Sequence, residues 1–341
     1  MVHADRASKL KFKIQEVQPM MTAKRLNEEH NKWSRNVPNL IFDCSSYNSP
    51  LSKFKYVQMF EKFNVVSVAK YYVSVEELCD NYVDSHVDHM LASKKDYHCS
   101  ASLSVETAYH NPRLVSYRTP MKWKGHSYIL PSQIKPMWCR LFTHYIDWLS
   151  HIPELSALTT DDQLILMMSR YVPIVNLLCA YRAIKYKIKG LVLSGETIYP
   201  RDMIEQVQID KRICFKQTNF IYDEFILPAK HMHLSESEYA LLRVLAYLMP
   251  TDSMSEKGKI IIREASNFYR EALCTLIRKS NPQSSYYEII DRVTRIMYFL
   301  TVMERSKQET NVQYSIMMLF NIPQLNENLI FNVHVNNDGG A

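Results

Sequence analysis

Residues 142–167, FTHYIDWLSHIPELSALTTDDQLILM, decide the fold of this chain. The pair Ile152-Pro153 ends one helix, because proline lacks the backbone donor that would continue the helical hydrogen-bond ladder. Thr160 and Gln163 then fit the reciprocal capping pattern, in which Ser or Thr and a Glu or Gln three residues later satisfy free backbone donors. The stretch therefore predicts two helices joined by a brief turn.

The second of these helices, residues 161–181, is apolar on nearly every face. Such a helix must lie between other layers of protein or in a membrane, and its polar ends and Pro173 favour a position between layers. No stretch approaches the roughly 18 apolar residues of a membrane span, so no membrane segment is expected. The helix is predicted to be the middle layer of a helical sandwich.

Further helices are predicted downstream from capping residues that precede apolar-periodic runs. They are Ser235/Glu238 before 236–249, Ser285/Glu288 before 286–320, and Ser255 before a helix that Asn281-Pro282 ends. Apolar triplets flank Gly195 in LVLSGETIY, residues 191–199, which suits a small β-hairpin, and one strand is expected within 123–129. The predicted fold class is all-α, a three-layer helical sandwich with one small β-hairpin.

Four regions are predicted along the chain. Residues 1–45 mix charge, proline and a polar turn and are expected to form a loosely ordered arm. Residues 46–131 are expected to hold two helices within 51–94 and then a long connection. The main domain is predicted over 132–325, and residues 326–341 are predicted to be a C-terminal tail.

Composition excludes several classes of protein. The formal net charge is +6 over 341 residues without a block of like charges, so direct nucleic-acid contact is not expected. The N-terminus lacks a signal-peptide core, which favours an intracellular protein. The seven cysteines are scattered and are expected to be reduced. Since no two lie two to four residues apart, no zinc-finger module is expected within this sequence.

Two stripes at helical spacing are candidates to line a cavity. One consists of Val172, Val175, Cys179 and Arg182, and the other of Met137, Trp138, Leu141 and Tyr145 on the preceding helix. Periodicity alone favours the alternative that both stripes are ordinary core, with Arg182 marking the end of its helix.

The run 142–167 resembles the ligand-binding signature of nuclear hormone receptors, with Phe, Trp, Ile-Pro, Asp-Gln and an apolar pair in family order. The resemblance covers about 132–320 and is closest to the divergent nematode-type receptors. It implies a small lipophilic ligand, with Arg182 facing it, and no cofactor. It also implies nuclear localisation, with a cytoplasmic pool allowed, and transcriptional regulation without a zinc-finger domain of its own.

The resemblance further implies a groove that binds the short amphipathic helix of a coregulator. The positions that match its wall are Ile146, Ser150, Leu155, Gln163, Leu164 and Met167. Ser150 stands where the family carries a lysine, and Glu327 is the only acidic candidate near apolar neighbours in the C-terminal region, so ligand-switched activation is in doubt. Leu141 replaces the polar partner that steroid-binding relatives give the arginine.

Dimerisation with a second copy or another nuclear receptor is expected through the long terminal helix. Its seam would consist of Ile289, Val293, Ile296, Leu300 and Met303, although the same spacing suits burial in the chain's own core. The alternatives are a ligand-independent dimerisation or coregulator-sequestering module, and a metal-dependent enzyme that uses His86 and His89 with His98 and Cys99 nearby. The enzyme is disfavoured because the HExxH spacing and the usual nucleophile and phosphate motifs are missing.

Overall fold

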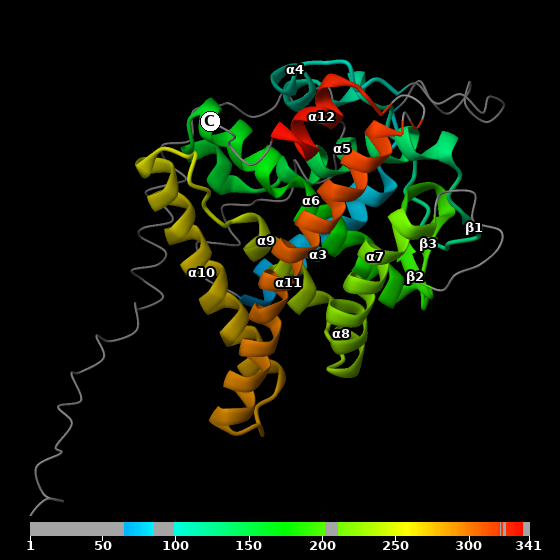
Figure 1. The fold of residues 1–341 in the computed structure, drawn as a ribbon. Helices are drawn as coiled ribbons and strands as arrows, with labels where there is room; N and C mark the ends of the chain where they lie inside the picture. The colour runs from blue at the N-terminus through cyan, green and yellow to red at the C-terminus, as the bar shows by residue number, and fades with distance from the viewer. Residues whose placement is uncertain (1–64, 85–98, 202–210, 321, 323–324, 337–341) are drawn as a thin grey trace, which may run out of the picture.

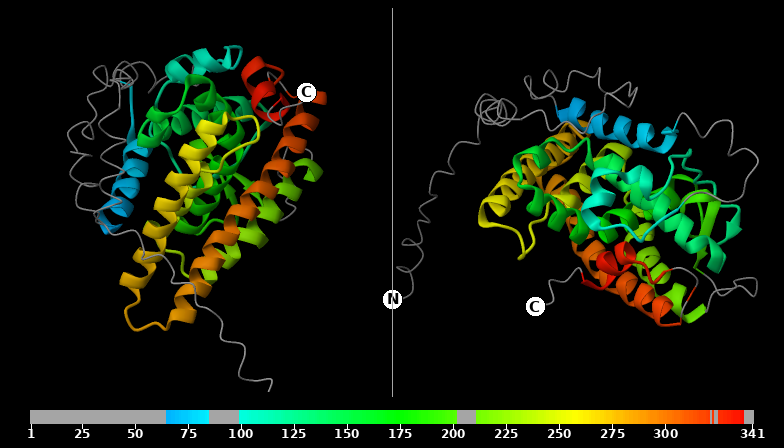
Figure 2. Two further views of the ribbon diagram at one scale, coloured as in Figure 1. Left: turned by 90° about the vertical axis from the view of Figure 1, so that its left-hand side faces the viewer. Right: turned by 90° about the horizontal axis from the view of Figure 1, so that it is seen from above.

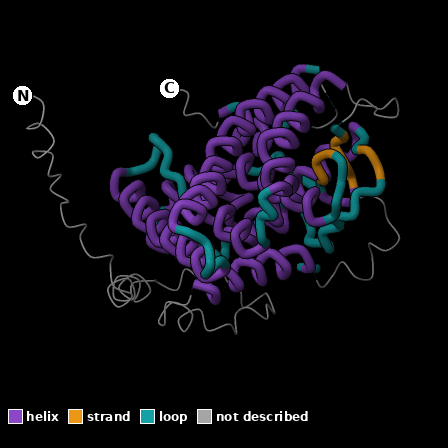
Figure 3. Tube along the Cα trace, turned by 90° about the horizontal axis from the view of Figure 1, so that it is seen from below, coloured by secondary structure: helices purple, strands orange, loops and turns teal. Residues whose placement is uncertain are grey.

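The computed structural model describes residues 65–84, 99–201, 211–320, 322 and 325–336. This part of the chain is mostly helical, with one small sheet at one end (Figures 1 and 3). The helices are α3 (Val65–Asn81), α4 (Val105–His110), α5 (Pro131–Leu149), α6 (Thr160–Lys185), α7 (Lys211–Ile221), α8 (Leu227–His231), α9 (Glu236–Tyr247), α10 (Glu256–Ser280), α11 (Tyr286–Leu319) and α12 (Asn328–His334). Short helical turns include η3 (Pro112–Leu114) and η4 (Pro153–Ala157), and the strands are β1 (Ser127–Tyr128), β2 (Gly190–Val192) and β3 (Thr197–Pro200).

The helices form three layers, which confirms the predicted fold class. α3 and α5 pack together as one outer layer, α6 and α9 form the middle layer, and α7 and α11 form the other outer layer. α10 contacts α3, α9 and α11 at the edge of the sandwich (Figure 2). The middle position of α6 follows from its composition, since a helix that is apolar all round must be covered on both sides.

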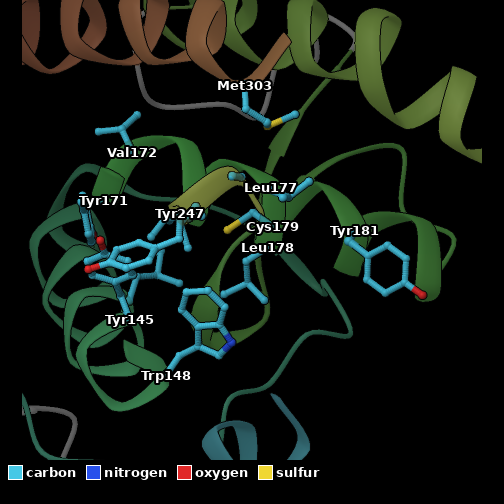
Figure 4. Close-up of a cluster of buried hydrophobic side chains, with 14 of the residues drawn as sticks. Tyr145, Trp148, Tyr171, Val172, Leu177, Leu178, Cys179, Tyr181, Tyr247 and Met303 are labelled. Atoms are coloured by element: carbon cyan, nitrogen blue, oxygen red, sulfur yellow. The ribbon is translucent and has the colours of Figure 1, made fainter. Parts of the chain in front are cut away.

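The interior of the sandwich is rich in aromatic side chains from α5, α6 and α9. Tyr145, Tyr171 and Tyr247 lie close together in Figure 4, with Trp148 beside Tyr247 at a ring-centroid distance of 6.0 Å. The prediction that no stretch approaches a membrane span is wrong for α6, which is long and apolar enough to cross a membrane, but 83% of its most apolar window is buried inside the fold. Its apolarity is therefore explained by the core.

Most of the predicted helix starts are confirmed. Ser235 with Glu238 and Ser285 with Glu288 form complete capping boxes, and Ser255 caps α10. The predicted cap Thr160/Gln163 is wrong by one residue. Thr159 is the N-cap of α6, and its side chain accepts a hydrogen bond from the backbone N–H of Asp162. The Gln163 side chain is thereby free to bind other segments.

The sheet contains the predicted hairpin and one more strand. β2 and β3 pair antiparallel around a turn in which Gly195 has a φ of 74°, a left-handed conformation that favours glycine. β1 lies within the predicted stretch 123–129 and pairs parallel to β3, so the strand order is β1-β3-β2. The sheet covers one end of α6 through β2.

The region predicted as an extension joins the same hydrophobic core as the main domain. α3 packs on α5, α9 and α10, and buried residues from both α3 and the 99–130 segment belong to the core cluster. The first expected helix, which would contain Phe54 and Phe63, lies outside the described residues. The second expected helix is α3, which ends at Asn81.

The cysteines whose side chains are described are free thiols, namely Cys79, Cys99, Cys139, Cys179 and Cys274.

Candidate functional site

A small cavity of about 30 Å³ lies between α5, α6, the sheet, α7, α11 and α12. The two predicted stripes supply one wall of it, namely Met137, Trp138, Leu141, Val172, Val175 and Cys179. The remaining lining residues were not foreseen from the sequence: Tyr171, Asn176, Leu191, Leu193, Tyr199, Gln217, Thr310, Tyr314 and His334. The stripes of two helices consecutive in the chain thus face a common interior space.

A hydrogen-bonded polar cluster forms one end of this cavity. The Asn176 amide donates to Ser306 Oγ at 3.0 Å and to Thr310 Oγ1 at 2.9 Å, and Gln217 Nε2 donates to Asn176 Oδ1 at 3.2 Å. Gln217 is buried, and its Oε1 has no hydrogen-bond partner among the described residues. A buried acceptor of this kind costs free energy unless a donor reaches it. The only sequence signal was Asn176, a polar residue within the apolar helix α6.

The C-terminal helix α12 closes the cavity through His334. Trp138 Nε1 donates a hydrogen bond to His334 Nε2 at 2.9 Å, and the His334 ring stacks on Tyr314 with centroids 4.0 Å apart. Burial lowers the pKa of His334 to about 3, so the imidazole is neutral and can accept from Trp138. Residues 328–334 were predicted as part of a tail; they form a helix docked on α6 and α11.

The predicted groove residues meet where α5 ends and α6 begins. Ile146, Leu155 and Met167 are buried, whereas Ser150 is exposed and caps the end of α5. The Gln163 amide donates to Leu155 O at 2.8 Å and Leu158 O at 3.2 Å, and its Oε1 accepts from Tyr109 OH at 3.1 Å. Leu164 is half-buried beside it and packs against the core.

The comparisons with known proteins follow the same arrangement. The family model described as the ligand-binding domain of nuclear hormone receptor matches residues 120–320. The chain belongs to this nuclear hormone receptor family. It is 30% identical to nuclear hormone receptor family member nhr-100 of Caenorhabditis elegans over 204 residues, 58% of this chain and 46% of that protein. It is 23% identical to member nhr-4 of the same organism over 228 residues, 66% of this chain and 45% of that protein.

A human protein, estrogen-related receptor gamma, is 27% identical to this chain over 128 residues, 38% of this chain and 26% of that protein. The resemblance to nematode-type receptors is confirmed by nhr-100 and nhr-4. The chain spans about half the length of the C. elegans relatives it matches. The matched part is the ligand-binding domain of a nuclear hormone receptor, and the family is one of transcription regulators rather than enzymes.

In this nuclear receptor domain, Arg182 does not line the cavity. Its guanidinium contacts Glu76 at 3.0 Å and Asp80 at 2.9 Å, both on α3. Burial alone would lower the pKa of Arg182, but the two carboxylates outweigh that effect and the pKa is raised. The expected contact with a ligand is replaced by an ion pair, because α3 covers this end of α6 and brings two carboxylates to the arginine.

The expected dimerisation seam of the receptor domain faces inward. Ile289, Ile296 and Met303 are buried, and Val293 and Leu300 pack against the core as partly buried side chains. This is the alternative that the spacing left open. The exposed face of α11 instead carries Tyr287, Ile290, Tyr298 and Val312.

The proposed metal site cannot be placed, because His86, His89 and His98 lie outside the described residues. Asp84, which lies next to them in the sequence, contacts Arg113 and Arg118. Within the described ranges, no group of three or more His, Cys, Asp and Glu side chains is arranged to hold a metal ion.

Proposed function

We propose that this domain regulates transcription in the nucleus, by binding a small apolar ligand in its cavity and coregulators in the groove, and by dimerising. The observation that carries this proposal is the cavity itself, in which the stripes of α5 and α6 meet under His334 of α12. An interior site closed by a terminal helix allows a ligand to bias the position of that helix. Because the chain spans about half of its relatives, the activity of the whole protein is part of the proposal.

The size and polarity of the cavity limit the ligand. About 30 Å³ is close to the space of one water molecule, whereas pockets for drug-sized ligands are roughly 300–1,000 Å³. A lipid-sized ligand therefore requires the aromatic side chains of Trp138, Tyr171 and Tyr199 to move. The unpartnered Gln217 Oε1 favours an apolar molecule with one hydrogen-bond donor, such as a hydroxyl, at that end.

Val175→Trp tests the ligand site. Val175 lines the cavity from α6, and an indole there would fill the space that a ligand needs. If a ligand binds, organic extraction of the wild-type protein followed by mass spectrometry should yield a stoichiometric apolar compound, and Val175→Trp should retain at least about tenfold less of it. Ile184→Trp, on the same helix and away from the cavity, is the matched control and should keep the compound.

The small volume favours one alternative, a ligand-independent interaction module whose interior is filled by its own side chains. In that case native mass spectrometry of the wild-type protein gives the mass of the polypeptide alone. Val175→Trp would then overpack the core and destabilise the domain by roughly 1–3 kcal/mol. This outcome would rule out the ligand and leave the interactions with proteins.

Dimerisation is proposed to use the outward face of α11. Tyr287 is 83% exposed and Tyr298 49% exposed, and with Ile290 they lie at helical spacing on one face. Aromatic side chains of this kind anchor protein interfaces. Tyr298→Glu should weaken a dimer at least about tenfold in sedimentation equilibrium. Ile260→Glu, an equally exposed position on α10, should leave the dimer unchanged, and a wild-type protein that is monomeric at high concentration would contradict the proposal.

A further inference from the structure

The groove expected for coregulators is covered by residues 99–118, which we name the groove segment. This segment contains α4 and η3, and its two ends pair, with Ser100 N donating to Val115 O at 2.9 Å. Its buried side chains include Ala108, Tyr109, Pro112 and Val115. In Figures 1 and 2, α4 lies beside α12 at the top of the molecule, and the two helices are in contact.

The groove segment contacts both helices that form the groove wall. The Tyr109 hydroxyl donates to Gln163 Oε1 on α6 at 3.1 Å. On α5, one turn before Ile146, the Thr143 hydroxyl lies 3.1 Å from Pro112 O and 3.3 Å from Ser116 O. Gln163 is one of the positions predicted to bind a coregulator, and it is already engaged by Tyr109. The same segment therefore spans the space between α5 and α6.

The groove segment also binds the third element at this site, α12. The Glu327 carboxylate at the start of α12 accepts from Ala101 N at 2.7 Å and from the Lys135 ammonium on α5. Leu329 N donates to Ala101 O at 2.8 Å. Glu327 was the only acidic candidate to bind an incoming helix. In this structure its carboxylate instead accepts a hydrogen bond from the backbone N–H of Ala101. Gln163 and Glu327, two polar groups expected at the groove, are thus both hydrogen-bonded to the groove segment.

We propose that the groove segment is an internal occupant of the coregulator groove and that a coregulator helix must displace it. The inference rests on the proposed function and adds its regulation. α4 is a short helix whose buried residues face the groove, the same type of structure that helix-in-groove sites accept. The groove segment and a coregulator helix cannot occupy the groove at the same time. The apparent dissociation constant of the coregulator helix is therefore the intrinsic constant divided by the fraction of domains in which the segment has left the groove.

The anchoring of the segment allows it to open without unfolding the core. Arg118 is buried and pairs with Asp84 and Asp147, and the backbones of Asp84 and Arg118 are joined by an N–H to C=O bond of 3.2 Å. The C-terminal end of the groove segment is therefore fixed to Asp84 and Asp147. A six-residue helix has little stability by itself, so α4 depends on its contacts with the groove.

Tyr109→Ala tests the proposal with a fluorescein-labelled amphipathic helical peptide that carries leucines at positions i, i+3 and i+4. Fluorescence anisotropy should show that the peptide binds Tyr109→Ala about ten to a hundred times more tightly than the wild-type domain. Leu114→Ala, an exposed position of the same segment, is the matched control and should bind like the wild type. Tyr109→Phe removes the hydroxyl that donates to Gln163 and provides a variant that keeps the ring buried, with a smaller gain expected.

Hydrogen exchange of residues 104–116 reports the segment directly and should increase in Tyr109→Ala and when peptide binds the wild type. Equal peptide affinity for wild type, Tyr109→Ala and Tyr109→Phe would overturn internal occupancy while leaving the coregulator groove standing. No binding by Tyr109→Ala, although exchange shows an open segment, would overturn the groove itself and with it this inference. Binding that survives Leu164→Asp in the Tyr109→Ala background would also overturn it, because the peptide would then lie elsewhere.

Discussion

Glu76→Gln is expected to lower the free energy of unfolding by about 3–5 kcal/mol, the largest effect of any single change considered for this domain. Glu76 lies on α3 and accepts from Arg182 at 3.0 Å and from Arg243 at 2.8 Å, and all three side chains are buried. After the substitution Arg182 still has its ion pair with Asp80. Arg243 has no such second partner, because Glu76 is the only carboxylate in contact with it among the described residues. The substitution leaves a guanidinium buried without an opposite charge.

Urea denaturation at neutral pH would measure this loss. Glu77→Gln is the matched control, since Glu77 is the next residue of α3 and is exposed, and its free energy of unfolding should stay within about 0.5 kcal/mol of the wild type. A loss below about 1 kcal/mol for Glu76→Gln would show that the Arg243 guanidinium is adequately stabilised by the Trp148 ring, which it overlies at 4.2 Å.

The second large effect is a dependence of stability on pH that originates at Glu154. This carboxyl lies in η4 and is buried, and its Oε1 accepts from Tyr269 OH at 2.9 Å while Oε2 has no partner among the described residues. Burial raises the pKa of Glu154 to about 7, although its hydrogen bonds oppose the shift. The folded state therefore holds a proton that the unfolded state has already released above its ordinary pKa of 4.5.

The sign of the effect follows from that difference. The raised pKa stabilises the folded state fully below pH 4.5, and this contribution is lost as the pH rises to about 7, in total by roughly 3 kcal/mol. Glu154→Gln removes the ionisation and keeps an acceptor for Tyr269. We expect the variant to gain about 2.5 kcal/mol of that amount relative to the wild type when urea denaturation is compared at pH 5 and pH 8, because part of the loss has already occurred at pH 5.

The control for this experiment is Glu271→Gln, an exposed position on α10 two residues from Tyr269. Its stability should follow the wild type at both pH values. If the curves of wild type and Glu154→Gln against pH run parallel, Glu154 ionises in the folded protein without a cost, and water must reach its carboxylate.

Local sequence was sufficient for the helical sandwich and for one wall of the cavity. The apolar composition of α6 required layers on both sides, and the helix starts at Ser235, Ser255 and Ser285 were confirmed because a cap depends on residues only three apart. The stripes of α5 and α6 were found for the same reason, since the helical period fixes which residues share a face.

The partners of individual side chains were decided by the tertiary structure. Arg182 forms an ion pair with Glu76 and does not line the cavity. His334 accepts a hydrogen bond from Trp138, which is 196 residues away in the sequence, and Gln163 accepts one from Tyr109, which is 54 residues away. Periodicity gives the face of a helix but not the segment that covers it, because that choice depends on the total burial and charge pairing of elements distant in sequence. The run 142–167 thus determined which fold this chain adopts. Only the packed chain determined that α12 closes its cavity and that residues 99–118 pack where α5 ends and α6 begins.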